Sequence, residues 1–139
     1  MYTLKTEASF DSAHFLKGYQ GKCSNIHGHR WRVVAEISSE HLNEDDQERG
    51  MLVDFSTFKK VLKEEADNLD HCLIIEKDSL PANLHRMLCD SGFRVVSLDF
   101  RPTAENLSRY FYIKLRERNL NVREVSVYET PNNCAVYSE

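Results

Sequence analysis

Two stretches of this chain alternate with a period of two residues, and each carries histidine at the end nearer the other. The first series is Leu4, Thr6, Ala8, Phe10, Ser12 and His14, and the second is His27, His29, Trp31, Val33, Ala35 and Ile37. Side chains at alternate positions of a β-strand point to the same face. If the strands pair antiparallel, the end of the first lies beside the start of the second. The pairing therefore predicts that His14 meets His27 and His29 at one end of a sheet.

The three histidines form a candidate metal site. His27 and His29 flank Gly28, so both imidazoles of an extended segment can face one point. A catalytic zinc site uses three protein ligands and leaves a fourth position for water or substrate. A single histidine is usually an ordinary core or strand-end residue, but three that converge through strand register predict a zinc site. Two roles are possible for Cys23. It can be a fourth ligand that closes a structural site, or a free nucleophile or base beside an open catalytic site.

Composition sets broad limits on the class of protein. A chain of 139 residues with 41% hydrophobic residues fits a single domain over residues 1–139 with a real core. The formal charge of −4 argues against a nucleic-acid surface, which needs a basic stripe. No apolar run approaches the roughly 20 residues of a membrane span, and the N-terminus has no signal-peptide core. With four cysteines and no CxxC pair, reduced thiols and a cytoplasmic location are expected.

Apolar residues recur at helical spacing in three segments. The predicted helices cover residues 56–69, with Asp54 or Ser56 as the N-cap, 80–89, with Pro81 in the first turn and Gly92 as the stop, and a segment that begins after Thr103. Further strands are predicted over 94–100, over 122–129 and from the turn at 131–133 through Tyr137. This order of elements predicts an α+β fold, with helices packed on one face of a mainly antiparallel sheet. The uncovered face and free edges of that sheet predict self-association.

Several polar residues outside the histidine cluster have both a chemical and an ordinary interpretation. Asp70 and His71 can act as an orienting carboxylate and a general base, although a histidine near a helix C-terminus is also favourable in itself. Glu129 shares a strand face with Val127, so its carboxylate points toward the apolar side, where it needs a bidentate cationic or amidine-like partner. The alternative for Glu129 is a solvated position at the rim of the sheet. Glu105 complements the dipole of the predicted third helix.

Six short blocks occur in order and span nearly the whole chain. They are Phe10-x-x-x-His14, Cys23-x-x-x-His27-Gly28-His29, Leu52-Val53-Asp54-Phe55, Leu69-Asp70-His71, Pro102-Thr103-Ala104-Glu105-Asn106 and Tyr128-Glu129-Thr130. Together they resemble the superfamily of 6-pyruvoyltetrahydropterin synthases and 6-carboxytetrahydropterin synthases. The resemblance implies a tunnelling fold, in which monomers join into trimeric barrels and two trimers stack into a homohexamer. It also implies the substrate 7,8-dihydroneopterin triphosphate.

The same resemblance implies a role for each candidate site residue. By position, His14, His27 and His29 hold a zinc ion. The other implied roles are proton transfer for Cys23, assistance to it for Asp70 and His71, anchoring of the pterin ring for Glu129, and a place near the substrate for Thr103 and Glu105. The segment from residue 80 to residue 100 is longer than in the most compact family members and receives no role.

Two details of the blocks favour the carboxytetrahydropterin branch, which acts in queuosine biosynthesis. They are the short gap between Cys23 and His27 and the Pro-Thr-Ala-Glu-Asn form of the helix start. The product of that branch is 6-carboxy-5,6,7,8-tetrahydropterin, with acetaldehyde released. Three alternatives stay open: the pyruvoyl branch, a structural zinc protein in which Cys23 closes the site, and a pterin-binding protein without turnover.

Overall fold

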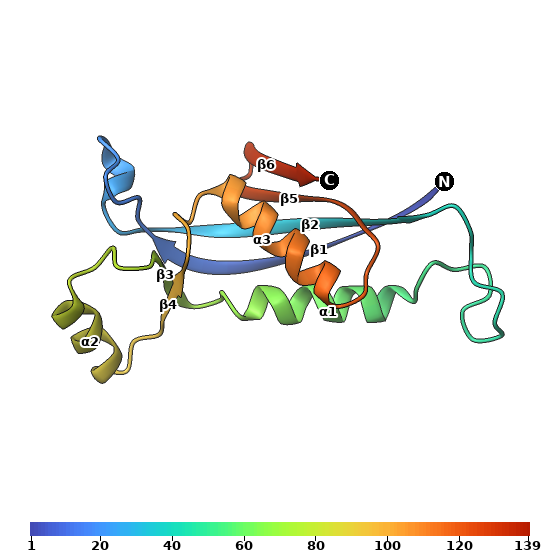
Figure 1. Ribbon diagram of the computed structural model, residues 1–139, viewed down its shortest axis with the longest axis horizontal. Helices are drawn as coiled ribbons and strands as arrows, with labels where there is room; N and C mark the ends of the chain where they lie inside the picture. Colours follow the sequence, from blue (N-terminus) through green and yellow to red (C-terminus); the bar gives the residue numbers. More distant parts are fainter.

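The computed structural model describes residues Met1–Glu139 as a six-stranded sheet, with two helices across one face and a third at one end (Figure 1). The strands are β1 (Tyr2–His14), β2 (His27–Ser39), β3 (Cys72–Glu76), β4 (Val95–Leu98), β5 (Val122–Thr130) and β6 (Asn133–Ser138). The helices are α1 (Phe55–Asp67), α2 (Ala82–Asp90), α3 (Ala104–Glu117) and the short 3-10 helix η1 (Lys22–Ser24). The strand order in the sheet is β4-β3-β1-β2-β5-β6. The predicted α+β class is confirmed.

The pairing of β1 with β2 agrees with the register predicted from the two alternating series. The strands are antiparallel, His14 lies opposite His27, and Ser12 lies opposite His29. Alternate positions then place all three imidazoles on the same face. This end of the pair also carries the connecting segment with η1, opposite the end that holds the N-terminus (Figure 1).

Strand β3 was not predicted from the sequence, and the pairing of this strand makes the sheet mixed. β3 pairs parallel with β1, and β4 pairs parallel with β3, so an otherwise antiparallel sheet is mixed. The prediction placed no strand between the first two helices and was wrong there. The reason is that Cys72-Leu73-Ile74-Ile75 is a short apolar run, and periodicity does not distinguish a fully buried strand from other buried segments.

The helices begin where local capping chemistry predicts. The Asp54 carboxylate accepts a hydrogen bond from the Ser56 N–H at 2.7 Å and caps α1. The Thr103 hydroxyl accepts one from the Asn106 N–H at 3.2 Å and caps α3. Pro81 is the N-cap of α2 and lies just before its first turn, whereas the sequence prediction had placed it inside that turn.

The core lies between the sheet and the helices α1 and α3. The fully buried side chains from the helices include Phe58, Leu62, Phe111 and Leu115, and those from the sheet include Trp31, Val33, Val125 and Val127. Helix α2 buries no residue and lies beyond β3 and β4 at the end of the sheet where His14 is found (Figure 1). None of the helices combines the length and apolar character needed to cross a membrane.

Candidate functional site

His14, His27 and His29 converge at one end of the β1–β2 pair. One ring nitrogen from each lies within 4.8 Å of the others, and the Nε2 atoms of His14 and His27 are 3.0 Å apart. The register that sets His14 opposite His27 produces this convergence, because His29 follows on the same face. Trp31 continues that face and meets the rings of His14 and His29 edge-on, with centroids at 5.0 and 5.2 Å. The buried indole thus forms an apolar floor beneath two of the imidazoles.

In two of these rings, a backbone carbonyl determines which nitrogen carries the proton and which presents a lone pair. The Pro102 carbonyl lies 2.7 Å from His14 Nδ1, and the Asn25 carbonyl lies 2.7 Å from His27 Nδ1. A carbonyl oxygen can only accept, so each Nδ1 carries the proton and each Nε2 presents a lone pair. Ligating histidines in metal proteins are commonly oriented in this way. The sequence gives no side-chain signal for these two carbonyls, although Pro102 stands in one of the six blocks.

Burial favours the neutral form of two of these imidazoles, His14 and His29. The His14 side chain is only 1% exposed, and burial lowers its pKa to about 4, against the opposing hydrogen bond to Pro102. Burial also lowers the pKa of His29. The Nε2 atom of His29 is buried without any hydrogen-bond partner, which is costly for a polar atom. A divalent metal ion would satisfy that lone pair together with the other two, and neutral imidazoles are the form that binds metal, so the donor set fits zinc.

Glu129 reaches this cluster from the end of β5. Its Oε1 atom lies 3.5 Å from Nε2 of both His14 and His29, and its side chain is about one-third exposed, at 34%. The carboxylate also lines a cavity of about 420 Å³, together with His29 and the outward-facing Arg30 and Arg32. Strand alternation predicts this inward placement of Glu129, and the structure shows it. The carboxylate therefore lies beside the imidazoles and also borders the 420 Å³ cavity.

Cys23 lies in η1, on the segment that joins β1 to β2. Its thiol is free and half-buried, and it is not among the ligand atoms that converge with the three imidazoles. The Cys23 carbonyl accepts a hydrogen bond from the Leu16 N–H at 2.9 Å, which holds the segment back against the end of β1. Within this chain the cluster therefore consists of three nitrogen donors, the arrangement of an open site.

Asp70 and His71 form a hydrogen-bonded pair in the turn between α1 and β3. His71 Nδ1 lies 2.8 Å from Asp70 Oδ2, and the Asp11 N–H donates to Asp70 Oδ1 at 2.8 Å. The Asp11 N–H, and to a lesser degree His71, holds the pKa of the Asp70 carboxyl below its usual value. An ionised Asp70 fixes the proton of His71 on Nδ1 and leaves Nε2 free to exchange protons. The His71 side chain is 80% exposed and does not belong to the imidazole cluster.

Thr103 and Glu105 are placed as their ordinary interpretations predict. The Thr103 hydroxyl is engaged as the cap of α3, and Glu105 is an exposed acidic residue in the first turn of that helix. The block that contains them contributes to the histidine cluster through the Pro102 carbonyl.

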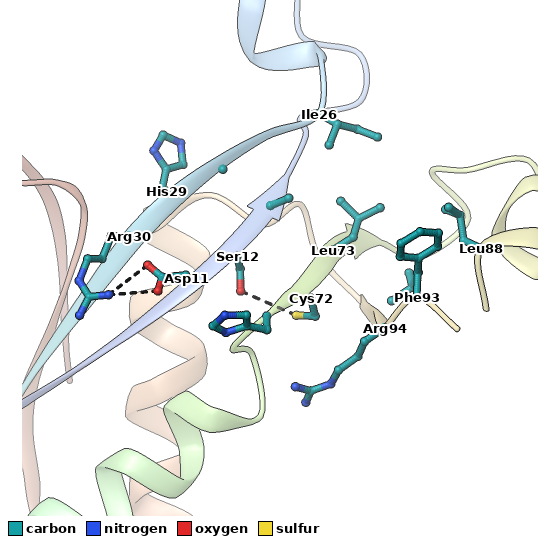
Figure 2. A pocket seen from close by; sticks show the side chains of 14 residues that line it. Asp11, Ser12, Ile26, His29, Arg30, Cys72, Leu73, Leu88, Phe93 and Arg94 are labelled. Carbon is teal, nitrogen blue, oxygen red and sulfur yellow. Dashed lines mark hydrogen bonds and ion pairs between the residues drawn. The ribbon is translucent and has the colours of Figure 1, made fainter. Parts of the chain in front are cut away.

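A second cavity, of about 650 Å³, opens beside the cluster between the start of β2 and the β3–β4 edge (Figure 2). Polar side chains from β1 and β2, including Asp11, Arg30 and His29, lie on one side of it, while Leu73, Leu88 and Phe93 lie on the other. His71 and Arg94 also line this cavity. The Asp70–His71 pair thus opens onto the same space as the backbone that carries His29.

In this α+β fold, one end of the sheet presents three converging imidazoles beside a carboxylate, which defines a candidate metalloenzyme. The family model described as 6-pyruvoyl tetrahydropterin synthase matches residues 3–139, and the chain belongs to this family of lyases. A 6-carboxy-5,6,7,8-tetrahydropterin synthase of Haemophilus influenzae is 34% identical, with all of both chains covered. One of Rickettsia bellii is 36% identical over 88% of this chain and 90% of the relative.

Solved structures show the same fold. An uncharacterised protein of Wolinella succinogenes superposes with a TM-score of 0.83 at 22% identity, covering 99% of this chain and 98% of its own. The 6-pyruvoyl tetrahydropterin synthase of Plasmodium falciparum gives a TM-score of 0.71 at 21% identity, over 99% and 97% of the two chains. At these identities the likeness supports the fold, while the family assignment rests on the sequence matches.

Proposed function

We propose that this enzyme is zinc-dependent and converts 7,8-dihydroneopterin triphosphate to 6-carboxy-5,6,7,8-tetrahydropterin, with release of acetaldehyde and triphosphate. The observation that carries the proposal is the set of three converging imidazole nitrogens, in a chain whose relatives are named for this product. In this proposal the reaction is a step of queuosine (7-deazapurine) biosynthesis in the cytoplasm. The four free cysteines are consistent with a reducing compartment.

The proposed metal ligands are His14, His27 and His29. A zinc ion held there supplies Lewis-acid polarisation of the oxygens on the substrate side chain, which makes the neighbouring C–H bonds more acidic. Glu129 anchors the pterin by accepting paired hydrogen bonds from its guanidine-like edge. Because its Oε1 lies 3.5 Å from two of the imidazoles, a ring held by Glu129 would have its side chain beside the ligand cluster.

The proton transfers are assigned to Cys23 and to the Asp70–His71 pair. The Cys23 thiolate removes a proton from a carbon of the substrate side chain, and His71 Nε2 exchanges protons while Asp70 holds Nδ1. These transfers reduce the pterin ring at the expense of the side chain and eliminate triphosphate. Cleavage of the next carbon–carbon bond, with uptake of water, then leaves the carboxylate and releases acetaldehyde. Thr103 and Glu105 are proposed to lie near the bound substrate.

The proposal includes a homohexamer built as a dimer of trimers. Two features of the single chain support assembly. The sheet ends in two unpaired edge strands, β4 and β6, through which sheets of neighbouring subunits can join. Apolar side chains are exposed around the 650 Å³ cavity, including Ile26 and Phe93. Assembly would also cover the exposed His71.

The choice between the carboxy and pyruvoyl products rests on the connection between Cys23 and the histidines. Only three residues separate Cys23 from His27, so the thiol is held close to the ligand strand. We propose that this approach favours cleavage of the second carbon–carbon bond. The pyruvoyl product, from a tetrahydrobiopterin-type pathway, is the alternative.

Incubation of the zinc-loaded protein with 7,8-dihydroneopterin triphosphate tests the proposed function. We expect acetaldehyde in equal amount to a pterin with the mass of the 6-carboxy compound. A pterin that keeps all three side-chain carbons, without acetaldehyde, would assign the chain to the pyruvoyl branch. Tight binding of the pterin without any product would instead identify a binding protein.

Substitution of Cys23 and Glu129 should separate chemistry from binding. Cys23→Ala should lower kcat by about 10²- to 10⁴-fold and leave the Kd of the pterin nearly unchanged, because proton transfer is needed only in the transition state. Glu129→Ala should weaken pterin binding and activity together, because the ring anchor acts in the ground state as well. The control is Cys134→Ala, which removes an exposed thiol from the edge strand β6. Near-normal turnover in Cys23→Ala would contradict its assignment as the base.

A further inference from the structure

The turn between α1 and β3 is held by an arginine that is distant in sequence. The guanidinium of Arg94 donates to the Asp70 carbonyl at 2.7 Å and to the Asn68 carbonyl at 2.7 Å, and it reaches the Asp67 carbonyl at 3.4 Å. The last carbonyls of a helix have no partner within the helix and carry its partial negative charge. A planar guanidinium can satisfy several of them at once, which an ammonium cannot do in the same geometry.

The backbone of Arg94 is attached to the same region. Its carbonyl accepts a hydrogen bond from the Leu73 N–H at 3.0 Å, and the next residue, Val95, lies opposite Leu73 in the parallel β3–β4 pair. Arg94 therefore bridges the turn before β3 with its side chain and the start of β3 with its backbone. In Figure 2, Leu88 and Phe93 lie on one side of the cavity and Arg94 points away from them.

His71 itself has a strained backbone within this turn. Its φ is +51°, in the left-handed region that a residue with a Cβ rarely adopts. Such a conformation persists only where the surroundings hold it firmly. From β1, the Asp11 carbonyl accepts from the His71 N–H at 2.7 Å, and the Asp11 N–H donates to Asp70. Arg94 supplies the restraint from the opposite side, through the carbonyl of the residue just before His71.

We propose that Arg94 is a positioning residue for proton transfer, which holds the Asp70–His71 pair at the angle its chemistry needs. This inference rests on the proposed function, in which His71 exchanges protons. It also gives a role to the segment from residue 80 to residue 100, which otherwise has none. That segment, with α2 and β4, brings Arg94 to the turn and fastens it there.

The test compares kcat, KM and zinc content in Arg94→Ala, Arg94→Lys, His71→Ala and the double variant Arg94→Ala/His71→Ala. Arg94→Ala should lower kcat by about 10- to 100-fold with KM and zinc content nearly unchanged, because a misplaced catalytic group loses rate rather than binding. Arg94→Lys should recover only part of the loss, and added guanidinium ion at low millimolar concentration should restore turnover to Arg94→Ala. The control is Arg86→Ala, which removes an exposed arginine from α2 in the same segment.

The double variant decides whether Arg94 acts through His71. If it does, removing Arg94 should have no further effect on kcat once His71 is absent. Two results would overturn the positioning role. One is an equal fold-loss of kcat in both backgrounds. The other is a loss of zinc and thermal stability with normal kcat for the folded protein. Wild-type kcat in Arg94→Ala beside a strongly impaired His71→Ala would overturn the inference alone. Wild-type kcat in His71→Ala would overturn the catalytic role of the pair, and the inference with it.

Discussion

The inward face of β2 changes character along its length. From Trp31 to Ile37 the inward side chains are apolar and buried against α1 and α3. From His27 to His29 the same face carries imidazoles, and the end of β1 opposite it contributes His14. One ladder of backbone hydrogen bonds thus supports two regions, an apolar half and a histidine end.

Beyond Trp31, whose indole Nε1 is also buried without a hydrogen-bond partner, the two regions differ in whether the chain satisfies its own buried groups. In the apolar half, side chains such as Val33 and Val125 need only packing partners, and the helices supply them. At the histidine end, two Nδ1 atoms are bonded to carbonyls, but His29 Nε2 has no hydrogen-bond partner, and Glu129 Oε1 lies 3.5 Å from it. A fold optimised for stability alone would not keep such an atom, so the comparison points to a bound group at this end.

The largest expected effect comes from removing a ligand at the histidine end. His29→Ala should abolish stoichiometric zinc binding and lower kcat/KM by about 10³-fold or more, because the open site loses one of three ligands. The protein should stay folded, since the apolar half is untouched. Metal analysis and activity measurements check this, with His41→Ala in the loop at the other end of β2 as the control. Full zinc retention in His29→Ala would remove that residue from the site.

A substitution in the apolar half should show the opposite pattern. Phe111→Ala should lower the free energy of unfolding by about 3–5 kcal/mol, because it leaves a cavity between α3 and the sheet. The fraction that remains folded should still bind one zinc per chain. Urea unfolding and metal analysis on the same samples test this, with the edge-strand substitution Val136→Ala as the control, expected within about 0.5 kcal/mol of wild type. Loss of zinc from folded Phe111→Ala would show that the two regions are not independent.

A smaller effect is expected from pH in the metal-free protein. The pKa of His14 is about 4 in the folded chain and near 6.5 when exposed, so the unfolded chain binds more protons between those values. The contribution of His14 to the free energy of unfolding should therefore be fully present above about pH 6.5. It should be lost as the pH drops toward 4, which lowers that free energy by about 3 kcal/mol. Unfolding free energies measured across this range should fall less steeply in His14→Gln than in wild type. Equal slopes would contradict the burial of a neutral imidazole.

The β1–β2 pair and the histidine cluster could be predicted from the sequence for a single reason. Long alternating runs fix which face each residue occupies, and a slip of one residue in the register would move every apolar side chain to the other face. His14 opposite His27 follows directly. Strand β3 could not be predicted, because this short strand lies between two parallel neighbours, β1 and β4, and its mostly buried residues show no period.

The contacts that complete the site also lay outside the reach of sequence patterns. The Pro102 and Asn25 carbonyls that orient His14 and His27 are backbone atoms, and every residue has one. The hydrogen bonds from Arg94 to the turn that holds Asp70 and His71 depend on the pairing of β4 with β3, which the sequence did not predict. Strand alternation did predict that Glu129 points inward, but the distance to His14 and His29 depends on how β5 pairs with β2.

The central claim is that the histidine end forms an open site of three imidazoles, with Cys23 free to react. X-ray absorption at the zinc edge of the zinc-loaded protein tests it most directly. The account predicts three imidazole nitrogens at about 2.0–2.1 Å, one further light-atom ligand and no sulfur. A sulfur ligand at about 2.3 Å that disappears in Cys23→Ser would contradict it, because the thiol would then close a structural site.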